Sequence, residues 1–250
     1  MSERIEHIMI EFFKGLDLLG PADPASTSRA LARVAPQADA VVVDVGCGTG
    51  RQTLQLLRET STAITATDMH QPFLDRMRQQ AERLGLAHRL RTMQADMNAL
   101  PLSPTSVDLI WCEGAIYSMG YEQGLRAWKP LLRPRGHLCV TEAAYLVDDP
   151  PAEVKEFWEA EYPAITTRAQ LELIARGCGY DLVESFQLPR SAWEAYYGPV
   201  ERRLDELAGT YADNPEWRQV LTAMRHEVDV FHRHGDTYGY VFLVLQKPAE

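Results

Sequence analysis

The stretch Val41-Val42-Val43-Asp44-Val45-Gly46-Cys47-Gly48-Thr49-Gly50 decides the fold of this 250-residue chain. Its first five residues are compact and four of them are valine, which is typical of a parallel strand buried on both faces. Three glycines at alternating positions follow, which permits a tight turn and a close approach of a ligand to the backbone. The next run, residues 51–59, carries three leucines on one side and predicts a helix. A strand, a glycine turn and a helix start together predict a nucleotide-binding site.

The glycine spacing indicates which nucleotide is bound. The dinucleotide fingerprint G-x-G-x-x-G would need a glycine where Arg51 stands, whereas the third glycine here is Gly50. A phosphate-binding G-x-x-x-x-G-K-[ST] loop is also absent from the sequence. Asp44 lies two residues before the first glycine, where its charge would disfavour a pyrophosphate and favour a cationic ligand. The sequence therefore disfavours an oxidoreductase that uses a nicotinamide dinucleotide.

The segment Asp44–Gly50 resembles motif I of the class I S-adenosylmethionine-dependent methyltransferases. In that family the glycine loop wraps the amino-acid end of the cofactor. The resemblance implies S-adenosyl-L-methionine as cofactor and S-adenosyl-L-homocysteine as product. It also implies cofactor contacts for a set of residues: Asp44, Gly46, Cys47, Gly48, Gly50, Gln52, Thr53, Asp68, Met69, Asp96, Met97 and Glu113.

Two of these residues are acids that follow predicted strands. Asp68 ends the strand predicted over residues 63–67 and lies 18 residues after Gly50 (68 − 50), where a doubly wound fold presents an acid to a ribose diol. The segment also resembles the family's motif II, which makes Met69 a neighbour of the adenine. A third strand is predicted over residues 90–95, and the resemblance implies that Asp96 binds the adenine amino group with Met97 beside it.

Three further side chains follow the fourth and fifth strands, which are predicted over residues 106–111 and 137–142. Ligands of open α/β sheets bind outside the carboxyl ends of the strands, so we expect Glu113, Tyr117 and Glu142 at the mouth of the site as catalytic candidates. Each could serve as a general base, and a capping or salt-bridged carboxylate is the alternative. Two acids at neighbouring strand ends would suit a cationic or amine-bearing substrate, or shared proton chemistry.

The remaining pattern predicts one α/β domain. The expected fold is Rossmann-like, with a mostly parallel seven-stranded sheet, an antiparallel last strand, helices on both faces and a helical insertion before the last strand. The domain is expected to have four parts. N-terminal helices occupy residues 1–35, and the helix over 3–19 either acts as a lid or packs on the domain edge. The other parts are a cofactor-binding core over 40–142, substrate-side helical insertions over 143–235 around strand six, and a closing edge strand over 238–247. Arg135 stands where the family's L-[KR]-P-G-G turn has its first glycine.

The composition of the chain limits the kinds of ligand and partner that it is expected to bind. A net charge of −10 disfavours a nucleic-acid substrate, because binding a phosphate backbone needs a basic face. The sequence contains no membrane-length apolar stretch and its start lacks the apolar region of a signal peptide. The four cysteines are scattered and read as buried thiols, and His232 and His234 do not share a helix face. We therefore expect a cytoplasmic protein, a small-molecule substrate, no nucleic acid, membrane or metal, and a possible homodimer.

Within the class, the chain most resembles small-molecule methyltransferases of the ubiquinone and menaquinone biosynthesis type. The Asn/Asp-Pro-Pro-[Tyr/Phe] signature of adenine and glutamine N-methyltransferases is missing after the fourth strand. The predicted function is therefore methylation of a small molecule by in-line displacement at the sulfonium methyl. The alternative is a non-catalytic subunit that binds S-adenosylmethionine or S-adenosylhomocysteine and acts through interaction with a partner.

Overall fold

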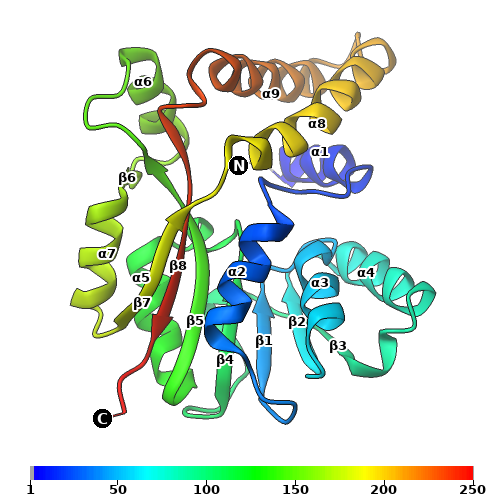
Figure 1. Ribbon diagram of the computed structural model, residues 1–250. Helices are drawn as coiled ribbons and strands as arrows, with labels where there is room; N and C mark the ends of the chain where they lie inside the picture. Colours follow the sequence, from blue (N-terminus) through cyan, green and yellow to red (C-terminus); the bar gives the residue numbers. More distant parts are fainter. Residues whose placement is uncertain (1–2, 250) are drawn as a thin grey trace.

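The protein is described by a computed structural model that covers residues 3–249 (Figure 1). One sheet runs through it in the order β3-β2-β1-β4-β5-β8-β7, with β6 paired to the end of β5. The predicted fold class is confirmed, with one short strand more than expected. The strands are β1 Val42–Val45, β2 Ile64–Asp68, β3 Leu90–Gln94, β4 Val107–Cys112, β5 Leu132–Tyr145, β6 Thr166–Thr167, β7 Asp181–Gln187 and β8 Tyr238–Gln246.

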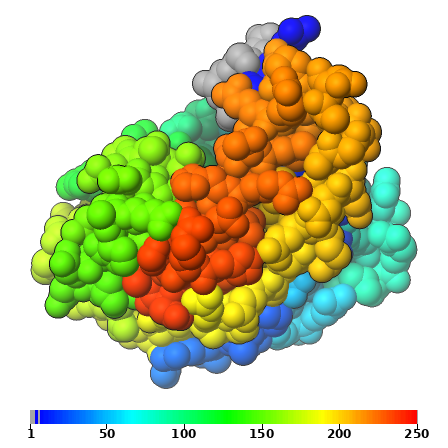
Figure 2. Space-filling model, turned by 90° about the horizontal axis from the view of Figure 1, so that it is seen from above, coloured from blue at the N-terminus to red at the C-terminus, as the bar shows by residue number. Residues whose placement is uncertain are grey.

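Helices cover both faces of the sheet (Figure 1). On one face α2, α3, α8 and α9 contribute to the largest apolar core, and on the other α5 and α7 contribute to a second core. Figure 1 shows α8 and α9 lying across one end of the sheet, and Figure 2, which looks down on that end, shows them over one side of it. The helices are α1 Glu3–Lys14, α2 Pro24–Val34, α3 Arg51–Glu59, α4 Gln71–Arg83, α5 Tyr121–Trp128, α6 Ala152–Glu161, α7 Arg168–Gly177, α8 Arg190–Thr210 and α9 Pro215–His234, with short 3₁₀ turns η1 Ala87–Arg89, η2 Met97–Ala99, η3 Ile116–Ser118 and η4 Lys129–Leu131.

The winding of the sheet places the site. Strand β1 pairs in parallel with β2 on one side and with β4 on the other, so the chain reverses its direction of winding between them. The loops that leave β1 and β4 therefore diverge toward opposite faces and open a crevice at their carboxyl ends. Ligands of doubly wound sheets bind at this point.

The N-terminal helix is shorter than the predicted one. It ends at Lys14, and the chain continues to α2 as a loop that includes the buried Leu16 and Leu18. The loop carbonyls bond to side chains from elsewhere: Arg76 donates to the Leu16 carbonyl at 2.8 Å, and Thr49 donates to the Asp17 carbonyl at 2.8 Å. The apolar spacing that predicted a helix over residues 3–19 thus reflects burial of a loop in its last part.

The closing strand is not at the edge of the sheet. Strand β8 pairs antiparallel with β5 on one side and with β7 on the other, so the antiparallel direction is confirmed and the predicted edge position is wrong. Its residues are buried from Tyr238 to Leu245, which fits a strand covered on both faces. Among the described residues, no helix is both long and apolar enough to span a bilayer.

Arg135 carries measurable backbone strain. It lies within β5 at φ +64°, in the left-handed region that glycine adopts without cost. Its backbone N–H donates to the Lys247 carbonyl, and its own carbonyl accepts from Gln246, so both bonds survive a change of side chain. We expect Arg135→Gly to raise the free energy of unfolding by about 1 kcal/mol. Urea unfolding measures this gain. The control is Arg91→Gly in β3, which should lower the free energy of unfolding. Equal decreases in the free energy of unfolding of both variants would show that the backbone at Arg135 is unstrained.

Candidate cofactor and substrate site

A cavity of about 300 Å³ opens at the carboxyl ends of β1, β2 and β4. Most of the residues predicted from the sequence to bind cofactor line it, together with the loop between α1 and α2. The predicted residues in its wall are Gly46, Cys47, Gly48, Gln52, Asp68, Met69, Met97, Glu113 and Tyr117, and they are joined by Asp17, Leu18, Leu19, Gly20, Pro21, Thr49, Thr67, His70, Ala95, Asn98, Gly114, Ala115 and Ser118.

The glycine loop needs its glycines at two walls of this cavity. Gly46 and Gly48 have φ of +70° and +52°, where a side chain would be strained. A Cβ on Gly46 would lie 2.4 Å from the Cβ of Ala115, and one on Gly48 would lie 2.7 Å from Cδ1 of Leu19. The loop therefore runs directly under the β4 loop on one side and the α1–α2 loop on the other. Gly46 and Gly48 line the cavity together with Ala115 and Leu19 from those two loops.

The third glycine, Gly50, allows two helices to pack closely. Gly50 is at φ +86°, and a Cβ there would lie 2.3 Å from Sδ of Met77 in α4. Gly50 does not line the cavity. It lets α3 begin close to α4, so its predicted contact with a cofactor is a packing contact in this structure.

Asp68 is the acid best placed to bind a ligand. Its Oδ2 accepts from the Gly48 N–H at 2.9 Å, and its Oδ1 accepts from the His70 N–H at 2.8 Å. These backbone donors fix the carboxylate at the cavity wall, and each oxygen retains a further lone pair. A pair of hydroxyl groups is the ligand that such a carboxylate suits.

Asp44 and Thr53 lie behind the loop, outside the cavity. The Thr53 hydroxyl donates to Asp44 Oδ2 at 2.5 Å, which joins α3 to β1. Burial raises the pKa of Asp44 to about 7, against the Thr53 hydrogen bond and with a further contribution from the charge of Asp68. The direct cofactor contact predicted for these two residues is not seen in the geometry, because a side chain inside a buried strand supports the loop from below.

Asp96 also stays out of the cavity wall, although its neighbours Ala95 and Met97 belong to it. The Asp96 carboxylate is exposed and accepts from the backbone N–H and the side-chain amide of Asn98, each at 2.8 Å. Those hydrogen bonds lower the pKa of Asp96. Asp96 therefore caps the turn η2 at the rim of the cavity.

Glu113 lines the cavity, and its carboxyl is held from behind. Its Oε1 accepts from Trp111 Nε1 at 2.8 Å and from the Thr27 hydroxyl at 2.9 Å. Thr27 is carried by α2, whose start is fixed by Asp23 accepting from the Ser26 N–H at 2.8 Å. Burial raises the pKa of Glu113 to about 8, although both hydrogen bonds oppose the shift. At neutral pH this carboxyl is therefore mainly protonated.

The raised pKa of Glu113 makes stability depend on pH. An unfolded glutamate ionises near 4.5, so between that pH and about 8 the unfolded chain holds fewer protons and stability falls as pH rises. We expect Glu113→Gln to gain up to about 2 kcal/mol relative to the wild type between about pH 5.5 and about pH 7.5.

Urea unfolding across that pH range measures the difference in free energy of unfolding between the wild type and Glu113→Gln. The contributions of Asp44 and Glu142 are the same in both proteins and cancel in this difference. The exposed Glu122, paired with Arg126 on α5, provides the control Glu122→Gln. A Glu113→Gln curve that runs parallel to the wild-type curve would contradict the raised pKa.

Tyr117 and Glu142 are placed differently from each other. Tyr117 lies on η3, lines the cavity and is 47% exposed, as expected for a residue at the mouth. Glu142 is 1% exposed and outside the cavity wall; its Oε1 accepts from the Ala143 N–H at 2.9 Å, and its buried Oε2 has no partner with good geometry among the described residues. Burial raises the pKa of Glu142 to about 8.

The prediction that Glu113 and Glu142 face the mouth as a pair is therefore wrong for Glu142. Glu113 bonds to α2, which covers one face of the sheet, whereas the charge of Glu142 acts on Tyr121 of α5, which covers the other. Side chains alternate between the faces along a strand, and the two strands bring these acids to opposite sides.

The loop over residues 15–23 is the part of the site that sequence reasoning missed. It supplies five residues of the cavity wall, of which Leu19 contacts Gly48. The lid alternative placed residues up to 19 over the mouth as part of a helix, and Gly20-Pro21 was interpreted as the end of that helix and not as part of a ligand site.

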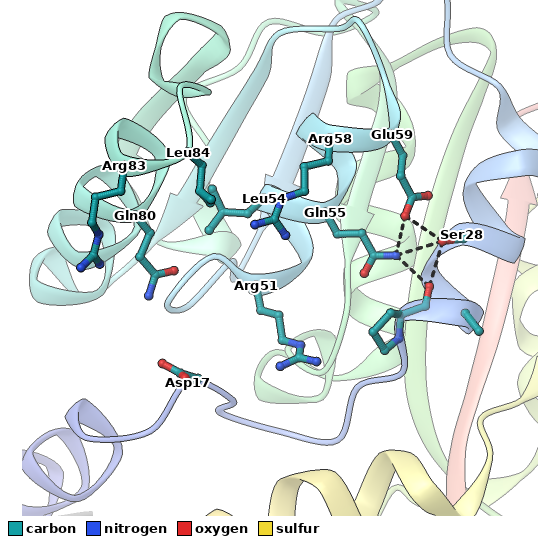
Figure 3. Close-up of a pocket in the computed structure, with 12 residues that line it drawn as sticks. Asp17, Ser28, Arg51, Leu54, Gln55, Arg58, Glu59, Gln80, Arg83 and Leu84 are labelled. Atoms are coloured by element: carbon teal, nitrogen blue, oxygen red, sulfur yellow. Dashed lines mark hydrogen bonds between the residues drawn. The ribbon is translucent and has the colours of Figure 1, made fainter.

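A larger groove lies on the outer surface between α2, α3 and α4 (Figure 3). It measures about 860 Å³ and is open, with Arg51, Arg58 and Arg83 in its walls. Figure 3 shows Gln55 and Glu59 bonded to Ser28 on one side of it. None of the predicted site residues lines this groove, so the larger volume of the groove does not identify it as the functional site. The smaller cavity holds the candidate chemistry.

Within residues 3–249, no cluster of three histidine, cysteine or acidic side chains is arranged to hold a metal ion. His232 pairs with Glu201 at 2.8 Å, and His234 pairs with Glu153 at 2.8 Å. Both histidines lie in the last turn of α9, and each contacts a different helix.

Comparison with known proteins fits this geometry. Residues 42–136 match the family described as a methyltransferase domain, which begins at β1 and ends inside β5. The chain is 28% identical over 249 residues to the methyltransferase GfsG of Streptomyces halstedii, a match that covers 93% of this chain and 83% of the relative.

Solved structures share the fold at low sequence identity. A SAM-dependent methyltransferase from Geobacter sulfurreducens, in complex with S-adenosyl-L-homocysteine, has a TM-score of 0.82 at 20% identity and covers 98% of both chains. The [4+2]-cyclase SpnF has a TM-score of 0.77 at 20% identity and covers 98% of this chain and 93% of its own. The fold is thus that of class I methyltransferases, and it also occurs in an enzyme named for a different reaction.

Proposed function

We propose that the chain is a class I S-adenosylmethionine-dependent methyltransferase that methylates a small molecule by in-line displacement, with the cofactor bound in the cavity beside Gly46, Gly48 and Asp68. The observation that carries the proposal is the glycine loop itself. Gly46 and Gly48 line the cavity, no Cβ fits between them and the adjoining Ala115 and Leu19, and Asp68 is fixed next to them. A ubiquinone-type substrate is not part of the proposal.

The residues present fit the cofactor. The open backbone at Gly46 and Gly48 suits its amino-acid end, and the anchored carboxylate of Asp68 suits the two ribose hydroxyls. Met69 is 53% exposed and lines the cavity, as Met97 does, so both present apolar surface to an adenine ring. When bound, S-adenosylmethionine supplies an electrophilic methyl group on a sulfonium sulfur. We propose the remaining predicted contacts, Cys47 and Gln52 in the wall and Asp96 at the rim, as secondary ones.

The chain's own contribution to catalysis is mainly positioning. A sulfonium is already a strong methyl donor, so alignment of nucleophile, carbon and sulfur supplies most of the acceleration. A base is needed only where the nucleophile arrives protonated. Glu113 and Tyr117 line the cavity as the candidates, and Glu113, whose pKa is raised to about 8, could accept a proton only from its ionised form. If Glu113→Gln and Tyr117→Phe each retained the wild-type kcat on an identified acceptor, neither would be the base.

A non-catalytic subunit that binds the cofactor is the second candidate. The cyclase SpnF has nearly the same fold, so the fold does not by itself determine the reaction. Turnover separates the two candidates, because only a methyltransferase converts S-adenosylmethionine to S-adenosylhomocysteine when an acceptor is present. The cytoplasmic location and the homodimer remain predictions.

Calorimetric titration tests the binding half of the proposal. The purified chain is titrated with S-adenosylmethionine, S-adenosylhomocysteine and NAD in separate runs. We expect binding of the first two in the micromolar range and none of NAD. A folded protein that binds neither sulfur compound would overturn the proposal.

A further inference from the structure

A group of tyrosines continues the cavity wall beyond Tyr117, beneath α8 and α9. The Tyr240 hydroxyl lies 3.8 Å from the position that a Cβ on Gly114 would occupy, and Gly114 lines the cofactor cavity. Tyr162 packs edge-on against Tyr117, with the ring centroids 6.0 Å apart. We call Tyr117, Tyr162, Tyr196, Tyr240 and the acid Glu227 the tyrosine cluster. It adjoins the end of the cavity at which a methyl acceptor would have to enter.

Glu227 brings a carboxylate from α9 into this cluster. The Tyr197 hydroxyl donates to its Oε1 at 2.8 Å, and its Oε2 has no hydrogen-bond partner among the described residues. Burial raises the pKa of Glu227 to about 7, and the nearby charge of Glu161 adds to the shift. Burial also raises the pKa of Tyr196 and Tyr240, and the charge of Glu227 raises both further.

Several polar atoms in and beside the cluster lack partners within residues 3–249. The hydroxyls of Tyr196 and Tyr240 make no hydrogen bond there, and the buried Trp193 Nε1 and Tyr238 hydroxyl are likewise unpaired. Trp193 lies against Tyr240, with ring centroids 5.1 Å apart. Native proteins rarely leave buried polar atoms unpaired, so the two at Trp193 and Tyr238 beside the cluster indicate a place for a ligand.

The charge of the cluster indicates what kind of ligand. Glu227 and Glu142 both act on Tyr117 and Tyr240, and neither acid has an ion pair with a lysine, arginine or histidine in the described part of the chain. Arg190, which follows the β7–α8 connection, covers Phe231 and pairs with Asp236. An anionic ligand would be repelled here. A cation would be attracted both by the carboxylate of Glu227 and by the faces of the aromatic rings.

We propose that the tyrosine cluster binds the methyl acceptor and that the acceptor is an amine, held as its ammonium ion between Glu227 and the rings of Tyr117 and Tyr240. This inference rests on the proposed methyl transfer and adds the substrate class to it. In this arrangement Glu227 contacts the substrate. No motif in the sequence indicated that role.

The arrangement also accounts for the proton. An ammonium nitrogen has no lone pair to attack with, so it must first lose a proton, and the carboxylate of Glu227 accepts it. The freed lone pair forms the bond to the methyl carbon, and the electron pair of the broken carbon–sulfur bond remains on sulfur as a thioether. The product carries the positive charge as an N-methylammonium ion, which balances the step.

The experiment uses the full chain saturated with S-adenosylhomocysteine. Tetramethylammonium chloride is titrated in and followed by tryptophan fluorescence, with neopentyl alcohol as an uncharged probe of similar shape and sodium chloride to hold ionic strength constant. We expect tetramethylammonium to bind at least about tenfold more tightly than the alcohol. Glu227→Gln should weaken tetramethylammonium binding by about tenfold and leave affinity for S-adenosylhomocysteine unchanged.

Glu201→Gln is the matched control, because Glu201 lies on α8, pairs with His232 and is outside the cluster. If Glu227→Gln fails to fold, Tyr117→Leu replaces it, since Tyr117 is 47% exposed and its loss should weaken tetramethylammonium binding as well.

Turnover is then measured with 2-phenylethylamine and 2-phenylethanol, and only the amine should give S-adenosylhomocysteine. Equal binding of the two probes, or an unchanged Glu227→Gln, would overturn the amine inference while cofactor binding stands. Absence of S-adenosylhomocysteine binding would overturn the proposed function and this inference together.

Discussion

Asp68→Ala is expected to raise the dissociation constant for S-adenosylmethionine about 100-fold, a loss of about 2.7 kcal/mol. The carboxylate is fixed by the N–H groups of Gly48 and His70, so its remaining lone pairs are available to a ribose diol without reorganisation. Losing two charge-assisted hydrogen bonds costs about 1.5–3 kcal/mol for each bond in the absence of compensation. Calorimetric titration measures the loss directly.

Two comparisons make this result specific. Asp75→Ala removes an exposed carboxylate from the neighbouring α4 that pairs only with Gln71 and Arg78, and it should leave affinity unchanged. Thermal unfolding of Asp68→Ala reports any disturbance of the loop that Asp68 anchors. A variant that unfolds like the wild type and binds S-adenosylmethionine as tightly would show that Asp68 does not hold the cofactor.

Gly46→Ala is expected to lower the free energy of unfolding by about 1–3 kcal/mol and to abolish measurable cofactor binding. The residue has φ +70°, and the added Cβ would stand 2.4 Å from the Cβ of Ala115. One wall of the cavity has to move, and both the glycine loop and the β4 loop are displaced from the position that a ligand needs.

The control for this variant lies in the same cavity. Gly20→Ala adds a Cβ that meets no atom within 4 Å, so it should change stability little. Combining Gly46→Ala with Ala115→Gly removes the clash and leaves the backbone strain, so it should restore part of the stability. Urea unfolding that gave equal values for Gly46→Ala and Gly20→Ala would contradict the close approach of the two loops.

The cofactor side of the site was largely predictable, because its residues sit in local patterns. Gly46 and Gly48 follow a valine-rich strand directly, and Asp68 ends the next strand. A strand end, a turn and their spacing are properties of adjacent residues, so the sequence carries them without any knowledge of packing. Helix α3 was predicted for the same reason, through the leucines of residues 51–59.

The parts that failed depend on tertiary contacts. Which face of the sheet Glu142 joins depends on the pleat of β5, which begins at Leu132 and not at the predicted His137. The contact of Leu19 with Gly48 joins segments that the sequence gives no reason to pair. Glu227 did leave a signal: it lies three residues after Met224 and four before Phe231, both buried, so an acid stands inside the apolar stripe of α9.

The central claim is that the cavity beside Gly46, Gly48 and Asp68 holds the cofactor of a methyl transfer. A crystal structure of the protein soaked with S-adenosyl-L-homocysteine tests it most directly. We predict density for the ligand in this cavity, with its ribose against Asp68 and its sulfur toward Tyr117. Density in the groove between α2, α3 and α4, or an empty cavity at saturating ligand, would contradict the account.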